Sequence, residues 1–208
     1  MSHNNIMKPK LLIATNNQGK VREIRAILQD LDIELVTPAD LGLELDVEED
    51  GQTYAENANK KALAFSSASG LTALADDSGL EVDALEGAPG LHSARYAPLP
   101  NATDADRRAI LLLNLSRKPR PWAARFRATV AIASPGRDVT TVEGICHGEI
   151  IPEERGEGGF GYDPIFRLEG LSKTMAELEM DEKNRLSHRG QALRKAILIL
   201  TELLKNQH

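Results

Sequence analysis

Short apolar runs alternate in the first part of the chain with stretches in which apolar residues recur at helical spacing. This pattern predicts that strands alternate with helices. Residues 10–15 (KLLIAT) form a short apolar run that is typical of a buried strand. From Lys20 onward, apolar residues recur at helical spacing, which predicts a helix to about Leu31. Residues 33–38 (IELVTP) predict a second short strand, which Pro38 ends.

An acidic loop is predicted next, over residues 44–51 (ELDVEEDG), and a helix follows it. Glu56 lies three residues after Thr53, which is the spacing of a capping box at a helix start. The positions predicted to lie on the buried side of this helix are Tyr54, Ala58, Ala62 and Phe65.

The middle of the chain predicts strands around one helix. Residues 71–80 (LTALADDSGL) predict an apolar strand that runs into two carboxylates and a Ser-Gly turn. A helix is expected to begin near Thr103. Residues 124–134 alternate strictly, which indicates a half-buried or exposed-edge strand, and residues 139–150 are expected to pair with it as a hairpin.

Two helical stretches are predicted to close the chain after a glycine-rich segment at residues 155–164. The apolar positions of the last helix are Leu193, Ile197, Leu200 and Leu204. Strands that alternate with helices, together with a central hairpin, predict an α/β fold with a mixed sheet. No repeat or linker divides the sequence, so we expect one domain over residues 10–208 after a flexible extension at residues 1–9.

Composition and charge exclude several classes of protein. The chain has 208 residues, 41% of them hydrophobic, and no apolar run approaches the ~20 residues of a membrane span. A net charge of −6 disfavours binding to a nucleic-acid backbone, although a local cluster of cations can still bind a small anion. The N-terminus lacks the apolar core of a secretory signal, and the single Cys146 fits a reducing, cytoplasmic setting.

The turn between the first strand and helix has the features of a phosphate-binding site, but also those of an ordinary connection. A helix N-terminus offers free backbone N–H groups, and Lys20 adds a full charge. Val21 stands where a Walker A loop has Ser or Thr, so the pattern is not that motif. The candidate residues are Thr15, Asn16, Asn17, Gln18, Gly19 and Lys20.

Carboxylates occur in two other segments. Asp76 and Asp77 follow an apolar run, so we expect them at the carboxyl end of a strand and on opposite faces of it. They are either turn formers and solvated charges, or one of them binds a metal or acts as a base while the other supports the local structure. Residues 48–50 (EED) face water or supply oxygen ligands to a hard cation. The spacing of Arg95 allows either a phosphate clamp or a surface ion pair.

Aromatic and cationic residues gather toward the C-terminus. Phe160 and Tyr162 stand among glycines, where they either stack on a flat ring or pack beneath a hairpin turn. Ser187 is a natural N-cap for the last helix. Three basic residues lie around this helix start: Lys183, His188 and Arg189. Cations there oppose the helix dipole, so the cluster is either a solvated basic face or the binding site of an anion or carbonyl-rich ligand.

Six segments in order resemble the successive motifs of the inosine/xanthosine triphosphate pyrophosphatase family. They are ATNNQGKVREI, GQTYAENANKKA, ADDSGLEVDALEGAPGLHSARY, GEGGFGYDPIF, KTMAEL and EKNRLSHRGQAL, and they span roughly Leu11 to Leu204. Two departures are small: TNN replaces the commoner Thr-Gly-Asn, and Tyr54 stands where Phe is frequent. The resemblance implies an elongated mixed sheet flanked by helices, two lobes with the active-site cleft between them, and a homodimer.

The resemblance also implies an activity, which is Mg²⁺-dependent hydrolysis of dITP, ITP and XTP to the monophosphate and pyrophosphate. Residues 15–20 would grip the triphosphate, and Ser78 would touch substrate. Asp77 would accept a proton and bind Mg²⁺ together with Glu49, which fits better than Glu48. The nucleoside would lie against Phe160, Gly161, Tyr162 and Asp163, and its base edge would be read by Lys183, His188 and Arg189.

Three rival functions remain at this stage. A Maf-like pyrophosphatase would prefer modified pyrimidine nucleotides, which the GGFGYDP and SHRG segments disfavour. A nucleotide-binding regulator without catalysis would lack an acid, whereas Asp77 and Glu49 are both present. An RNA-associated protein is disfavoured by the net charge of −6.

Overall fold

The computed structural model describes residues 8–205, and within them six strands form a single mixed sheet. The spatial order is β2-β1-β3-β4-β5-β6. The strands are β1 (Lys10–Ile13), β2 (Glu34–Val36), β3 (Thr72–Val82), β4 (Trp122–Ala133), β5 (Thr140–Ile150) and β6 (Phe166–Leu168). β1 runs parallel to β2 and β3, whereas all later neighbours are antiparallel, which confirms the predicted α/β fold with a mixed sheet.

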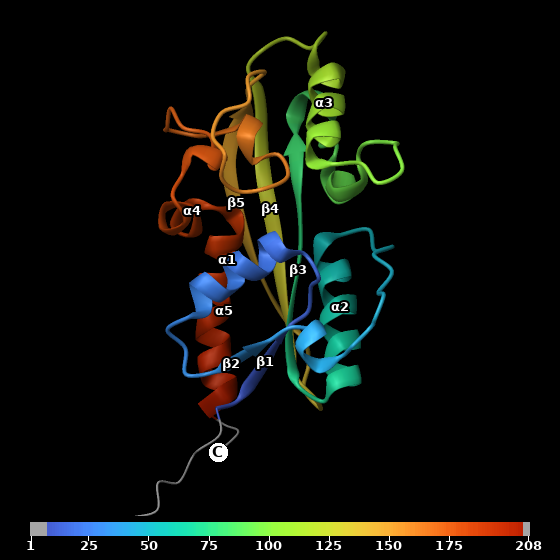
Figure 1. Ribbon diagram of the computed structural model, residues 1–208, viewed down its shortest axis with the longest axis vertical. Coiled ribbons are helices and arrows are strands. Elements are labelled where there is room, and N and C mark those ends of the chain that lie inside the picture. Colours follow the sequence, from blue (N-terminus) through green and yellow to red (C-terminus); the bar gives the residue numbers. More distant parts are fainter. Residues whose placement is uncertain (1–7, 206–208) are drawn as a thin grey trace, which may run out of the picture.

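Helices cover both faces of this sheet (Figure 1). They are α1 (Gln18–Leu28), α2 (Tyr54–Ser69), α3 (Asp104–Leu115), α4 (Met180–Leu186) and α5 (His188–Lys205). Short 3₁₀ segments are η1 (Ala39–Leu41), η2 (Asp83–Leu85), η3 (Gly90–Arg95), η4 (Asp163–Ile165) and η5 (Met175–Glu177). α2 packs on β3 and β4 from one side, and α5 packs on β4 and β5 from the other. Within residues 8–205, no helix is both long and apolar enough to cross a bilayer.

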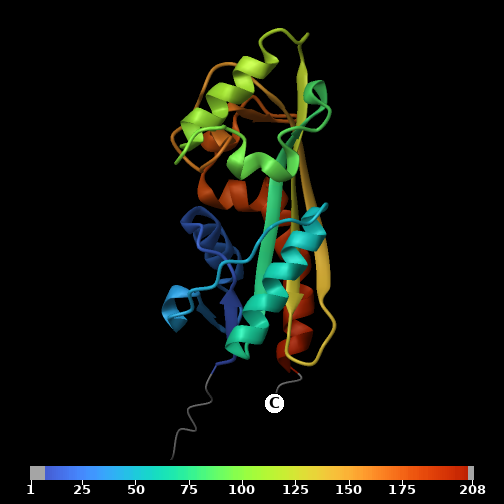
Figure 2. The same cartoon turned by 90° about the vertical axis from the view of Figure 1, so that its right-hand side faces the viewer.

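The long strands β3, β4 and β5 run through both ends of an elongated molecule (Figures 1 and 2). At the end that holds β1 and β2, apolar clusters fill both faces, one under α2 and one under α1 and α5. At the opposite end, a third cluster lies under α3 on one face only. The other face there carries ion pairs from Glu81 to Arg125 and Arg127.

The helix starts follow the predicted capping, except that the capping box at Thr53 is incomplete, because Glu56 Oε2 accepts from Gln52 N (2.7 Å) rather than from Thr53 N. Thr53 Oγ1 accepts from Glu56 N (3.1 Å), and Thr103 forms a full capping box with Asp106. Ser187 Oγ accepts from Gly190 N (3.1 Å) at the start of α5. The core-facing positions predicted for α2 are all buried, as are Leu193 and Leu200 of α5, with Ile197 partly buried. The side chain of Leu204 lies outside the described residues.

Three local expectations need correction. β3 does not turn at Ser78-Gly79, because β4 pairs with it without interruption as far as Val82. β4 is not an edge strand, since β3 and β5 flank it. The half-buried alternative holds for its first six residues, where burial alternates, whereas the later residues are buried throughout because α2 covers that end. α1 begins at Gln18 rather than Lys20 because Asn17 caps it, and it ends at Leu28 rather than at Leu31.

The expected N-terminal extension lies mostly outside the described residues, which begin at Lys8. The two described residues of that segment make contacts. Pro9 O accepts from Glu34 N (2.9 Å), and Lys8 Nζ lies 2.8 Å from Asp32 Oδ1.

Candidate active site

A cleft of about 270 Å³ brings together residues from α1, α2, β3, α5 and the segment that follows β5. The predicted phosphate-binding turn and the cations at the start of the last helix therefore lie side by side in space, although most of the chain separates them in sequence. The predicted site residues that line the cleft are Thr15, Asn17, Lys20, Glu49, Asp77, Ser78, Phe160, Gly161, Tyr162, Asp163, Lys183, His188 and Arg189.

The cleft lies along the edge of β3 where its neighbour has ended. β1 pairs last at Ile13, opposite Leu74, so β3 continues without a strand on that side. Asp76 O, two residues further on, accepts instead from Lys61 Nζ (2.9 Å) and Lys20 Nζ (3.4 Å). Two ammonium groups thus converge on one strand carbonyl. The predicted carboxylates are therefore mid-strand, at an edge exposed by the short β1, rather than at the end of β3.

Asp76 points to the α1 and α5 face of the sheet and is held by two cations. Its Oδ1 lies 3.1 Å from Lys20 Nζ, and its Oδ2 accepts from Arg189 Nε at 3.0 Å. Burial alone would raise the pKa of Asp76, but the charges of Lys20 and Arg189 outweigh burial and lower it. Asp76 is therefore a permanently charged structural anchor for the two cations.

Asp77 points to the α2 face and has a different environment. Its Oδ2 accepts from Asn57 Nδ2 (3.0 Å), and its Oδ1 accepts from Ser78 N (2.9 Å). The residue is only 6% exposed, and no cation of the described chain lies within ion-pair distance of it. Burial raises the pKa of Asp77, against the opposing effects of Lys61 and Asn57. A buried carboxylate of this kind can accept a proton or bind a cation.

Glu49 is the acid of the 44–51 loop that reaches the cleft, whereas Glu48 is exposed and does not line it. Its Oε1 accepts from Lys61 Nζ (2.6 Å), and its backbone carbonyl accepts from Arg95 Nη2 (3.1 Å). Arg95 does not line the cleft, and its bond to the backbone of Glu49 holds the acidic loop in place.

Lys61 was missed by the sequence analysis. It is 8% exposed and lies four residues after Asn57, on the buried side of α2. Two polar residues at helical spacing on an otherwise apolar face were the available signal, because buried polar groups need partners.

The cations near the start of α5 do not form a solvated face. Lys183 Nζ lies 2.6 Å from both Glu23 Oε1 and Asp163 Oδ2. Arg189 Nη1 lies 2.5 Å from Glu23 Oε2, and its Nη2 donates to Ser78 Oγ (3.0 Å). Glu23, also missed from sequence, is 2% exposed in α1; burial would raise its pKa, but Arg189 and Lys183 lower it.

His188 is buried and stacks on Phe126, with ring centroids 4.7 Å apart and an interplanar angle of 12°. Burial lowers the pKa of His188 well below its usual range, and the nearby Arg189 lowers it further. The imidazole is therefore neutral at physiological pH, with one N–H donor and one acceptor.

The aromatic residues of the glycine loop (residues 155–162) have separate environments. The ring of Phe160 lies at the cleft, 5.0 Å from Lys183 Nζ and 5.5 Å from Arg189 Cζ. It packs so close to α1 that a Cβ atom on Gly19 would lie 2.6 Å from its Cδ1. Tyr162 is 4% exposed and its hydroxyl donates to Ser93 O (2.9 Å), so it packs beneath the loop.

The early turn divides its side chains between two sites. Asn17 Oδ1 accepts from Lys20 N (3.1 Å) as the helix cap, and Thr15 Oγ1 accepts from Asn17 N (3.2 Å). Asn16 and Gln18 are exposed and do not line the cleft, and Gly19, which is buried against Phe160, does not line it either. The helix N-terminus and Lys20 therefore face the cleft, whereas the side chains of Asn16 and Gln18 do not.

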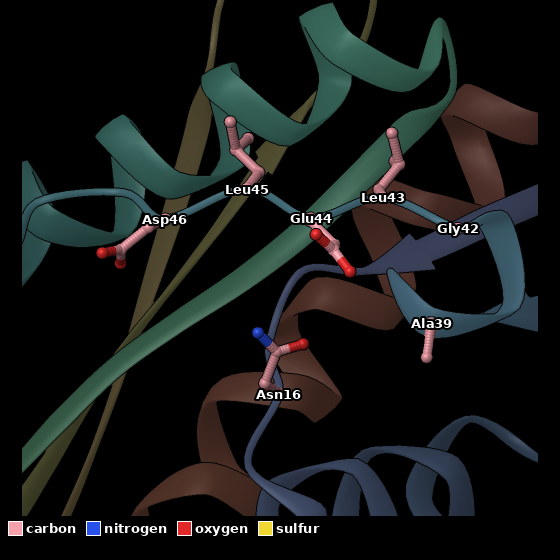
Figure 3. A pocket seen from close by; sticks show the side chains of 7 residues that line it. All are labelled: Asn16, Ala39, Gly42, Leu43, Glu44, Leu45 and Asp46. Carbon is pink, nitrogen blue, oxygen red and sulfur yellow. The ribbon is translucent and has the colours of Figure 1, made fainter.

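Asn16 lines a second hollow of about 700 Å³, together with Ala39 and residues 42–46. Figure 3 shows Leu43 and Leu45 turned toward α2 and away from Asn16. The charged residues in this lining are the acids Glu44 and Asp46, so the hollow does not suit a polyanion. The smaller cleft, with its convergent cations and carboxylates, is the candidate active site.

The sequence is similar over nearly its whole length to those of known proteins. A chain of Desulforamulus reducens, named dITP/XTP pyrophosphatase, is 48% identical over 198 residues, which cover 95% of this chain and 98% of the relative. A Bacillus subtilis protein of the same name is 44% identical over 197 residues, covering 94% and 98%.

Comparison of structures agrees with the sequences. The structure of a HAM1 protein from Coxiella burnetii superposes with a TM-score of 0.84 at 41% identity, covering 93% of this chain and 99% of that one. The model of the Ham1 family matches residues 11–198. This protein therefore belongs to the Ham1 family.

Proposed function

We propose that this protein hydrolyses the non-standard purine nucleoside triphosphates dITP, ITP and XTP to the monophosphate and pyrophosphate. The observation that carries the proposal is the exposed edge of β3, where Lys20 and Lys61 converge beside Asp77 in a cleft that Phe160 also lines. The relatives named dITP/XTP pyrophosphatase support the same substrate class.

The phosphate end of the cleft is cationic for a physical reason. The N-terminus of α1 offers backbone N–H groups, and the two ammonium groups of Lys20 and Lys61 lie beside it. A triphosphate carries about four negative charges at neutral pH, so these groups would bind it and offset the charge that develops as the anhydride breaks.

Asp77 would orient the attacking water and accept its proton. It lies on a rigid central strand, and its raised pKa reflects a carboxylate with little direct compensation. The same feature fits a magnesium ion, because Asp77 and Glu49 offer hard oxygen ligands and Mg²⁺ usually keeps water and phosphate oxygens besides one or two carboxylates. Within residues 8–205 no cluster of three or more acid, His or Cys side chains could hold a metal by itself. When bound, Mg²⁺ would polarise the phosphates and neutralise their charge.

The base end of the cleft offers donors to a purine carbonyl. Lys183 has three N–H groups, and its two carboxylate partners leave one for a ligand. A carbonyl at position 6 of the purine would accept a hydrogen bond from this N–H. The 6-amino group of adenine is itself a donor, so it could not accept that bond. Phe160 would stack on the ring, and neutral His188 would line the pocket.

A substrate panel tests the proposal. With Mg²⁺ present, we expect dITP, ITP and XTP to be turned over faster than ATP, dTTP or modified pyrimidine triphosphates, with release of pyrophosphate rather than orthophosphate. Preference for the pyrimidine set would support a Maf-like pyrophosphatase, and binding without turnover would support a regulator. A homodimer in the cytoplasm belongs to the same proposal, and light scattering tests the dimer.

A further inference from the structure

The glycine loop needs contacts from outside to hold Phe160 in place. Gly156, Gly159 and Gly161 all have positive φ (82°, 74° and 63°), and the loop has no strand or helix of its own. Glycine in this region has many alternative conformations of similar energy. The backbone bonds around Phe160 therefore decide where its ring lies.

Arg108 of α3 ties the two ends of this loop together. Its Nη1 donates to Gly161 O (2.8 Å), next in sequence to Phe160. Its Nε and Nη2 donate to Glu154 Oε1 (2.8 Å) and Oε2 (2.9 Å), just before the loop begins. The Arg108 side chain is only 13% exposed, and paired bonds from a planar guanidinium fix its geometry.

Asp104 adds a second bond from the same helix. It lies one turn before Arg108, so the two side chains share a face of α3. Asp104 Oδ2 accepts from Gly161 N (2.7 Å), so both the N–H and the carbonyl of Gly161 are bound to α3. In Figure 2, α3 lies beside the orange segment that contains this loop.

We propose that Arg108 and Glu154 form a clasp that positions the glycine loop, and with it Phe160, to receive the base of the nucleotide. The inference rests on the proposed function, and these are positioning residues because neither touches the reacting phosphates. Without the clasp, the loop would keep the bonds from Asp104 to Gly161 N and from Asp163 to Phe160 N but lose those that fix the Gly161 carbonyl. Nucleotide binding would then have to restrict the added motion of the loop, which would lower substrate affinity. The rate of the chemical step at Asp77, on β3, would be little affected.

The test compares the base end with the phosphate end of the same site. For Arg108→Leu we expect KM for ITP to rise about tenfold, in line with the loss of charge-assisted hydrogen bonds, and kcat to change less than about threefold. Competitive inhibition by inorganic tripolyphosphate, which has no base, should keep its inhibition constant. Glu154→Gln should raise KM by a smaller factor, and Arg108→Lys should recover part of the loss. The matched control is Glu153→Gln, an exposed neighbour with no side-chain partner in residues 8–205, which should behave as wild type.

Amide hydrogen exchange gives a readout that needs no turnover. Residues 155–162 should exchange faster in Arg108→Leu than in wild type, while β3 and β4 keep their protection. Unchanged exchange together with unchanged KM would overturn the clasp, as would an equal loss of ITP and tripolyphosphate binding, which indicates a general structural defect. If wild type fails to hydrolyse ITP, the proposed function fails, and exchange still decides the clasp.

Discussion

Asp76 and Asp77 are neighbours in β3, yet their carboxylates lie on opposite faces of the sheet and have opposite electrostatic environments. Asp76 is bound by Lys20 and Arg189, and its pKa is lowered. Asp77 is bound by the uncharged Asn57, and its pKa is raised, chiefly by burial. Alternation along a strand therefore separates a structural carboxylate from the carboxylate that we propose as the proton acceptor.

Asp77→Asn should abolish turnover and leave the fold intact. The amide has the same shape and removes a buried charge that lacks a direct cationic partner, so the free energy of unfolding should not fall by more than about 1 kcal/mol. Turnover of ITP should fall by at least about a hundredfold, because the proton acceptor is lost. Steady-state kinetics and equilibrium binding of ITP measure this, with nucleotide affinity largely retained. Near-wild-type turnover would remove Asp77 from the mechanism.

Asp76→Asn should instead destabilise the protein. Lys20 and Arg189 would lose a fully buried counter-charge, and breaking a buried ion pair costs about 3–5 kcal/mol. Urea unfolding at neutral pH measures the difference from wild type. Asp32→Asn is a control, since Asp32 pairs with Lys8 at an exposed site. Equal stability of the two variants would contradict the anchoring role of Asp76.

The pattern of the sequence was sufficient for the fold class and for the starts of α2, α3 and α5, but not for the cap of α1 at Asn17. The pattern and the family resemblance together gave most residues of the cleft. Thr53, Thr103 and Ser187 could be predicted because capping depends on the few residues around each helix start. The continuation of β3 through Asp76 and Asp77 could not be predicted in this way. It depends on cations supplied by α1, α2 and α5, from distant parts of the chain.

The cations Lys183 and Arg189 illustrate the same limit. Their residue types indicated a ligand site, but their carboxylate partner Glu23 lies on α1, far away in sequence. An alanine variant of Arg189, which looks like a simple test of base recognition from sequence, would leave Glu23 and Asp76 buried without this partner. Loss of stability would therefore accompany any loss of selectivity.

His188 should make stability depend on pH. Its pKa is lowered in the folded protein, so the unfolded chain binds a proton first as pH falls through the ordinary histidine pKa of about 6.5. The free energy of unfolding should then decrease by up to about 1.4 kcal/mol per pH unit below that value. Urea unfolding from pH 7.5 to 5.5 should show this loss in wild type relative to His188→Gln. His147→Gln, at an exposed position, is the control and should follow wild type.

Gly19→Ala should weaken binding of ITP without weakening the fold. Gly19 lies in α1 without a positive φ, so alanine favours the helix by up to about 1 kcal/mol. Its Cβ, however, would lie 2.6 Å and 2.9 Å from Cδ1 and Cε1 of Phe160, so the ring must move.

We expect the KM for ITP to rise about three- to tenfold in Gly19→Ala, while thermal unfolding shifts upward or stays unchanged, because the displaced ring gives up a stacking contact worth roughly 0.5–1.5 kcal/mol. A double-mutant cycle with Phe160→Leu isolates the cause, since the smaller side chain leaves room for the new methyl group. In the Phe160→Leu background, Gly19→Ala should change KM little. A full, additive effect in that background would mean that Gly19 acts on the phosphate end of the cleft rather than through Phe160.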